Sequence, residues 1–136
     1  MAAGMTIAEA IDVIEETYEF MLAYAAQGRR SEDDEDQGSG IRERLTRAEA
    51  ALGVVASATV EAIAKDAQAD AQAGAAAEFL EVVKADAARA RAAFRLVLVQ
   101  RSIGSQVVDN LNATTHVRTL LTDLFLLDET LKISGL

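Results

Sequence analysis

The residues best suited to chemistry lie together in a polar stretch near the C-terminus. His116 is the only histidine of the chain, and its neighbours are mostly asparagine and threonine. These neighbours are mediocre helix formers, because their side chains compete for backbone hydrogen bonds or lose rotamer freedom. Four residues of the stretch would share one side of a helix by their spacing: Asn112, Thr115, His116 and Thr119. They are a candidate polar site for a small ligand, and the alternative is a hydrogen-bonded polar section of helix.

The sequence of residues 115–122, THVRTLLT, resembles the H-box of sensor kinases, whose pattern is H-E-x-R-T-P-L-T. The resemblance implies phosphoryl transfer through His116. The match departs at three points: one residue is missing between histidine and arginine, Val117 stands where the pattern has an acid, and a leucine replaces proline. The missing acid is the proton acceptor that this chemistry needs. A His-centred phosphotransfer or signalling module is therefore kept as an alternative function.

Other catalytic and metal-binding patterns do not occur in the sequence. The chain has no cysteine, which rules out disulfides, thiolate nucleophiles and cysteine metal sites. Metal sites in helical bundles use Glu-x-x-His pairs, but Ala113 stands three residues before the single histidine. Neither a G-x-S-x-G elbow nor a phosphate-cradling glycine-rich loop is found. We expect no catalytic, cofactor-binding or metal-binding residues, and a protein that is not an enzyme.

Four stretches of the chain have apolar residues at the spacing of an α-helical stripe: residues 7–25, 41–59, 80–97 and 113–131. Proline is absent and alanine is abundant, which favours uninterrupted helices. With 136 residues, about half of them hydrophobic, the chain is long enough for one domain with a real core. We therefore predict an all-α fold, an antiparallel four-helix bundle built from two αα-hairpins.

We expect residues 1–136 to form one helical-bundle domain with a single disordered acidic loop at residues 29–39. Five consecutive acids in this loop repel one another, and the flanking glycine and serine favour no ordered structure. The second and third helices are separated only by an alanine-rich tract whose sole breaker is Gly74. Either the chain turns at Gly74 or one long helix runs through it, and we favour the turn. The last helix is predicted to run unbroken over residues 105–132.

The charge of the chain points to proteins as its partners. A formal net charge of −9 disfavours nucleic acid and anionic membranes as ligands. A membrane span is not expected, because no stretch approaches about 18 consecutive apolar residues. The N-terminus lacks the basic region of a signal peptide, so we expect a cytoplasmic protein. The first helix has an acidic outer face that could dock a basic partner or stay solvated: Glu9, Asp12, Glu16 and Glu19.

The last helix has more apolar surface than one buried stripe requires. A single stripe accounts for four of its leucines, whereas Leu121, Phe125 and Leu126 lie beside or beyond that stripe. A surplus of this kind places a helix at the centre of a bundle or in an interface. We predict that these three residues form the interface of a homo-oligomer, most simply a dimer. The expected function is that of a non-enzymatic assembly or adaptor protein that binds itself and another protein.

Overall fold

The computed structural model describes residues 4–31, 40–63, 70–133 and 135–136. Within these residues it contains six α-helices and no strand, which confirms the all-α prediction. The helices are α1 (Ile7–Ala25), α2 (Ile41–Ala56), α3 (Val60–Ile63), α4 (Asp70–Leu98), α5 (Ser105–Ala113) and α6 (His116–Leu131). None of the described helices is long and apolar enough to cross a membrane.

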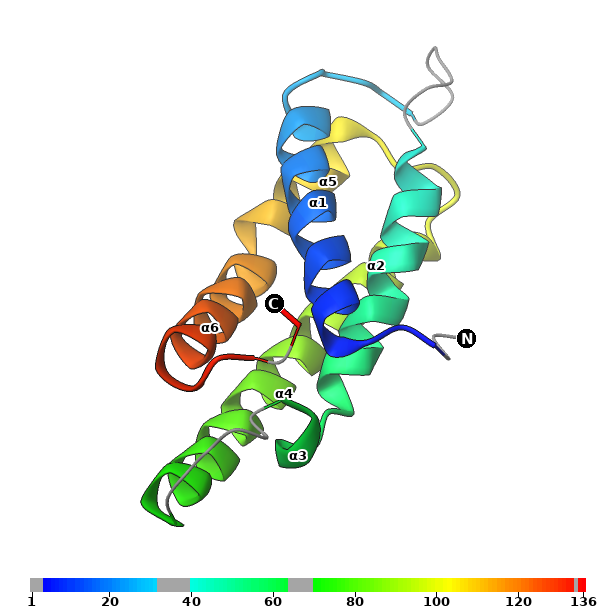
Figure 1. Ribbon diagram of the computed structural model, residues 1–136. Helices are drawn as coiled ribbons and strands as arrows, with labels where there is room; N and C mark the ends of the chain where they lie inside the picture. The colour runs from blue at the N-terminus through cyan, green and yellow to red at the C-terminus, as the bar shows by residue number, and fades with distance from the viewer. Residues whose placement is uncertain (1–3, 32–39, 64–69, 134) are drawn as a thin grey trace.

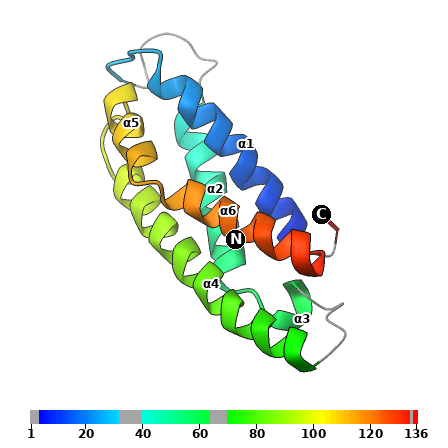
Figure 2. The same cartoon turned by 90° about the vertical axis from the view of Figure 1, so that its left-hand side faces the viewer.

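The helices pack around one apolar core. α1 lies against α2 on one side and against α5 and α6 on the other, while α4 lies against α2 and α6 (Figures 1 and 2). The predicted stripes of α2 and α4 face this core, and Leu52, Phe94 and Leu124 are at most 1% exposed. Burying a side chain of this size contributes about 1.5–3 kcal/mol to folding. The apolar periodicity therefore identifies the inner faces of the long helices.

The predicted last helix is in fact two helices. α5 ends at Ala113 and α6 begins at His116, and between them Thr115 has a φ of 59° in the left-handed region. The hydroxyl of Thr114 donates to the carbonyl of Leu111 at 2.7 Å. Threonine hydroxyls compete with helical hydrogen bonds, and a left-handed residue cannot continue a right-handed helix. The polar residues that stand out in the sequence thus form the break itself.

The predicted turn at Gly74 is wrong. Gly74 lies inside α4, where an added Cβ would meet nothing within 4 Å. The chain breaks earlier, at residues 57–59, after the end of α2. There the Thr59 hydroxyl accepts a hydrogen bond from the backbone N–H of Ala62 at 3.2 Å and caps the short helix α3. A glycine costs a helix about 1 kcal/mol, which a long helix can absorb, whereas a threonine cap favours a new helix start.

The two ends of α1 are fixed by side chains. At its start the Thr6 hydroxyl accepts from the N–H of Glu9 at 3.1 Å, and the Glu9 carboxylate accepts from the N–H of Thr6 at 2.9 Å, which together form a capping box. At its end the Tyr24 hydroxyl donates to the carbonyl of Ile103 at 2.6 Å. The Ser105 hydroxyl donates to the carbonyl of Tyr24 at 2.6 Å. These bonds join the end of α1 to the start of α5.

The first residue of the predicted acidic loop, Arg29, is hydrogen-bonded to the start of α5. The N–H of Arg29 donates to the Ser105 hydroxyl at 2.8 Å, and the N–H of Ser105 donates to the carbonyl of Arg29 at 2.8 Å. Arg29 is therefore part of the junction between α1 and α5. Residues 32–39, which hold the acidic run, lie outside the described residues, so the prediction of disorder there stays a prediction.

Charged side chains fix the orientation of α4 against α2. The Glu49 carboxylate accepts from Nε of Arg91 at 2.6 Å and from Nε of Arg95 at 2.8 Å. Burial acts to raise the pKa of Glu49, but the hydrogen bonds and charges of the two arginines outweigh it and hold that pKa below its usual value. The Arg42 guanidinium donates to the carbonyl of Leu98 at 2.8 Å and caps the end of α4. These contacts fix the rotation of α4 about its own axis and so determine which of its residues face away from α2.

Candidate functional site

The four residues predicted as a polar ligand site surround the break between α5 and α6. Asn112 is partly buried, and its side-chain amide donates to the carbonyl of Met21 at 3.2 Å, which links α5 to α1. Its other side-chain atom, Oδ1, is buried without a hydrogen-bond partner among the described residues. His116 is partly exposed as the first residue of α6, and Thr115 and Thr119 are exposed. One of the four is thus used in helix packing, and the other three lie at the surface.

The three residues predicted as an interface do not form one exposed patch. Leu121 is only 6% exposed and belongs to the core, whereas Phe125 and Leu126 are 48% and 55% exposed. Successive helix residues point about 100° apart. Phe125 consequently lines a groove between α6 and α1, and Leu126 lines a separate groove between α6 and α4.

The groove between α1 and α6 combines apolar side chains with acidic ones. Its volume is about 340 Å³. Leu121 and Phe125 of α6 line it together with Tyr18 of α1. The charged and polar lining residues are Glu15, Glu19, Arg118 and Thr122. The groove therefore offers an apolar floor beside a pair of carboxylates from one helix.

The carboxylates on the α1 side of this groove favour a positive group, while α6 contributes one cation to the lining, Arg118. Burial raises the pKa of Glu15, and the negative charges of Asp12, Glu19 and Glu16 raise it further. Like charges at three- and four-residue spacing on a helix cost a few tenths of a kcal/mol per pair. A cationic side chain placed against Glu15 and Glu19 would relieve this repulsion. An apolar side chain with a lysine or arginine beside it therefore matches the groove.

Sequence reasoning identified Phe125 and Leu121 but missed their neighbours on α1. Tyr18 falls within the apolar stripe predicted for residues 7–25, yet it is partly exposed and lines the groove. Glu15 was not singled out at all. A usable signal was present, because Glu15 follows Ile14 and precedes Tyr18 by three residues, at the edge of the apolar stripe. The apolar periodicity of α1 does not indicate which neighbouring helix this edge of the stripe faces.

The groove between α4 and α6 is mostly apolar, with a volume of about 360 Å³. Its large lining side chains that remain accessible are Phe79 of α4 and Leu126 and Leu131 of α6. Val82, which is 44% exposed, follows Phe79 by three residues on the same helix. No charged residue is found among the described residues that line this groove. An apolar side chain of a partner could insert into this groove, but the groove has no charge with which to select one partner over another.

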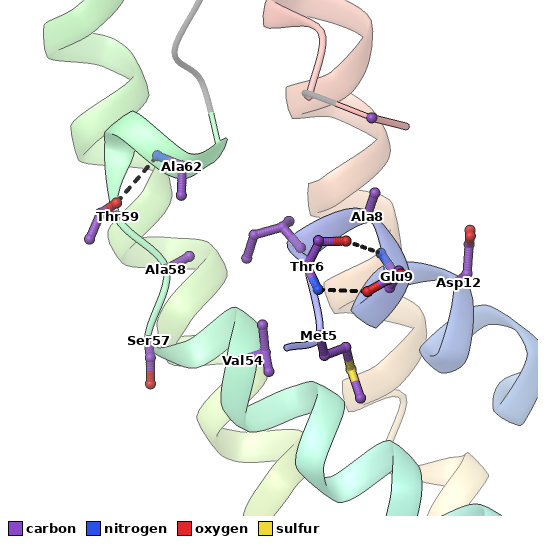
Figure 3. Close-up of a pocket in the computed structure, with 12 residues that line it drawn as sticks. Met5, Thr6, Ala8, Glu9, Asp12, Val54, Ser57, Ala58, Thr59 and Ala62 are labelled. Carbon is purple, nitrogen blue, oxygen red and sulfur yellow. Dashed lines mark hydrogen bonds between the residues drawn. The ribbon is translucent and has the colours of Figure 1, made fainter. Parts of the chain in front are cut away.

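A wider cavity, of about 820 Å³, lies between the start of α1 and the segment that joins α2 to α3 (Figure 3). Glu9 and Asp12 line it from α1, and Ser57 and Thr59 line it from the other side. The start of a helix attracts anions, but here the capping carboxylate of Glu9 takes that position. Since its described lining contains two acids and no basic residue, the cavity does not suit an anionic ligand.

Two carboxyl groups meet between α4 and α6. Burial, followed by the hydrogen bond and the charge of Asp86, raises the pKa of Asp123 to about 7. Asp86 also accepts a hydrogen bond from Arg89 at 2.8 Å. A proton shared by two carboxyls removes their repulsion. Among the described residues, no group of three or more potential ligands is arranged for a metal ion, and we interpret the pair as a pH-dependent packing contact.

Comparisons with known proteins give no relative from which a role could be transferred, so the geometry of the described residues carries the functional argument. No family model, no curated protein and no solved structure matches this chain.

Proposed function

We propose that the protein is a non-enzymatic interaction module that binds a segment of another protein in the groove between α1 and α6. The observation that carries the proposal is Phe125, an aromatic residue left 48% exposed beside the carboxylates of Glu15 and Glu19. Aromatic side chains contribute strongly to interfaces because they bury a large area with few rotatable bonds. An exposed aromatic at the edge of an acidic groove is thus a suitable anchor point for a partner.

The partner segment is best matched by an amphipathic helix. Grooves between two helices bind a third helix through apolar anchors at successive turns. In this groove the anchor would contact Tyr18 and Phe125, while a lysine or arginine one turn away would contact Glu15. Opposite charges at the rim direct the orientation of the partner and speed its association more than they raise its affinity. The module would therefore select basic, amphipathic helices.

We also propose that the chain assembles as a homodimer of antiparallel four-helix bundles in which α5 and α6 together supply the fourth position. This proposal is supported by apolar side chains that remain exposed on the subunit, including Leu96 and Val99 at 66% and 77%. Soluble monomers seldom leave contiguous apolar surface uncovered. Self-association and partner binding use different surfaces and can be tested separately.

The groove is tested with designed peptide probes and fluorescence anisotropy. The probe is an amphipathic helical peptide with leucine anchors and flanking lysines, and its control has glutamate in place of lysine. We expect binding of the basic probe only, weakening as salt is raised because exposed charges are screened. Phe125→Ser should weaken binding at least about tenfold, a loss of about 1.4 kcal/mol. Leu126→Ser, the adjacent residue in the other groove, should have little effect.

Removing the acidic side chains tests the proposal that the groove selects basic partner helices. The double variant Glu15→Gln and Glu19→Gln keeps the shape of the groove, and should lower the affinity and abolish its salt dependence. Equal binding of the basic and acidic probes by the native protein would refute this proposal. So would an unchanged affinity in Phe125→Ser.

A further inference from the structure

α4 is apolar on its outer face as well as on its inner face. Five exposed residues follow one another at steps of three and four: Ala85, Ala88, Ala92, Leu96 and Val99. We call them the outer stripe. Leu96 and Val99 are the two most exposed large hydrophobic residues described in the chain, at 66% and 77%. The N–H of Val99 donates to the carbonyl of Arg95 at 3.2 Å, so the helical path continues through the whole stripe.

The outer stripe lies opposite the side of α4 that packs into the subunit. The buried residues Val83, Ala87, Ala90 and Phe94 face α2 and α6. In Figure 2, α4 forms one edge of the molecule, with α2 and α6 on its other side. A surface helix of a folded subunit has a polar outer face, whereas a helix that is apolar all round is covered on both sides. The C-terminal half of α4 thus has an apolar stripe on its outer face as well, flanked by the exposed side chains of Arg89 and Arg95.

The distribution of residue sizes along the outer stripe is self-complementary in one orientation. Ala92 is its midpoint, since Ala88 and Leu96 are each four residues away and Ala85 and Val99 are each seven residues away. An antiparallel copy centred on Ala92 places Leu96 over Ala88 and Val99 over Ala85. Large side chains then meet small ones along the contact, which allows the two helices to approach closely. A parallel copy would instead stack Leu96 on Leu96.

The charges along α4 favour the same orientation. The half of the helix before the outer stripe carries Glu78 and Glu81, and the Glu81 side chain is 76% exposed. The opposite end carries Arg95, with its side chain 60% exposed, and the exposed Arg101. Antiparallel pairing centred on Ala92 brings Glu81 of each copy toward Arg101 of the other, whereas parallel pairing brings like charges together along the whole helix. It also places Arg95 over Arg89, but each of these arginines is paired with a carboxylate of its own subunit, Arg89 with Asp86 and Arg95 with Glu49.

We propose that the outer stripe is the surface through which two copies of the chain pair, antiparallel, with Ala92 on the two-fold axis. This inference rests on the self-association in the proposed function and assigns its surface. It leaves the groove between α1 and α6 free in both copies, so that the dimer presents two partner sites. The contact is isologous, because the same residues from both copies form it.

Sedimentation of native protein and two double variants at micromolar concentration tests the surface. We expect native protein to sediment as a dimer and Leu96→Glu with Val99→Glu to sediment as a folded monomer, because each glutamate would place a charge in the apolar contact, over Ala88 or Ala85 of the other copy. The matched control is Phe125→Glu with Leu126→Glu on α6, which should remain dimeric. A native monomer would overturn self-association and this inference together, without affecting the groove. A dimer that survives changes at Leu96 and Val99 but not at Phe125 and Leu126 would overturn this inference alone.

Cysteine cross-linking tests the orientation, since the chain has no cysteine of its own. The single variants Ala85→Cys and Val99→Cys are made, one of them with an affinity tag, then mixed and oxidised. Antiparallel pairing predicts that the mixed species dominates, while each variant alone cross-links poorly. Efficient cross-linking of either variant with itself would indicate a parallel pair and overturn the proposed orientation. Glu16→Cys, on the outer face of α1, supplies the background level of random collision.

Discussion

At the scale of single residues, Gly104 is the position where one added atom matters most. A Cβ there would lie 2.6 Å from the carbonyl oxygen of Arg30 and 3.0 Å from that of Arg29. Both are backbone atoms, which cannot rotate away as a side chain would. We expect Gly104→Ala to lower the free energy of unfolding by about 1–3 kcal/mol, the usual cost of overpacking. Gly74→Ala, made where an added Cβ meets nothing, should instead raise it by about 1 kcal/mol.

Urea denaturation of both glycine variants measures these changes. Equal stability of Gly104→Ala and the native protein would mean that the junction between α1 and α5 can open to admit a methyl group. A destabilised Gly74→Ala would mean that the start of α4 requires glycine for a reason other than space. In the sequence, Gly74 stands between Ala73 and Ala75, and Gly104 stands between Ile103 and Ser105; neither pair of neighbours indicates what an added Cβ would meet. Only the structure distinguishes them.

The isolated histidine can be tested at the same scale. His116 is partly exposed at the start of α6, and we predict that it is not catalytic. His116→Gln keeps hydrogen-bonding capacity and should change the free energy of unfolding by no more than about 0.5 kcal/mol, as surface substitutions usually do. Circular dichroism and sedimentation should be unchanged as well. An acid-labile phosphate found on His116 in the native protein, and lost in the variant, would favour phosphotransfer instead.

At the scale of elements, the sequence predicted inner faces better than helix ends. The stripe through Leu45 and Leu52 in α2 and the stripe through Val83 and Phe94 in α4 are buried as expected. Periodicity succeeds there because it records which side of a helix leaves water. The helix boundaries at residues 57–59 and at Thr115 were missed. They depend on hydroxyl hydrogen bonds and on one left-handed residue, neither of which changes the apolar spacing.

The candidate site could be predicted only in part for a related reason. Phe125 stood out because an aromatic beyond the stripe is visible in the sequence. The outer stripe of α4 did not, because alanine adds little apolar area and arginines stand between its members. Its three- and four-residue spacing from Ala85 to Val99 was available all the same. Which of two apolar faces packs inward depends on neighbouring helices, and that information is tertiary.

The contact between α4 and α6 should respond to pH through Asp86 and Asp123. The pKa of Asp123 is raised from 3.8 to about 7, so the folded protein binds more protons than the unfolded chain between these values. Stability from this contact is therefore fully present below about pH 4 and is lost as the pH rises through about 7. Asp123→Asn removes the titrating group and should flatten this part of the stability profile. Urea midpoints of both proteins between these pH values provide the measurement, and parallel profiles would contradict the assignment.

At the scale of the whole molecule, stability and assembly should be linked. A dimer that forms only from folded subunits stabilises them by mass action, so the thermal midpoint rises with protein concentration. We expect this rise in native protein and in Phe125→Glu with Leu126→Glu. The variant Leu96→Glu with Val99→Glu should show a midpoint independent of concentration, since its pairing face on α4 is disrupted. Scanning calorimetry over a wide concentration range separates the cases. A concentration-independent midpoint in native protein that still sediments as a dimer would show that the pairing adds nothing to folding. The subunit core, with Phe94 buried beneath the outer stripe, would then account for all of the stability.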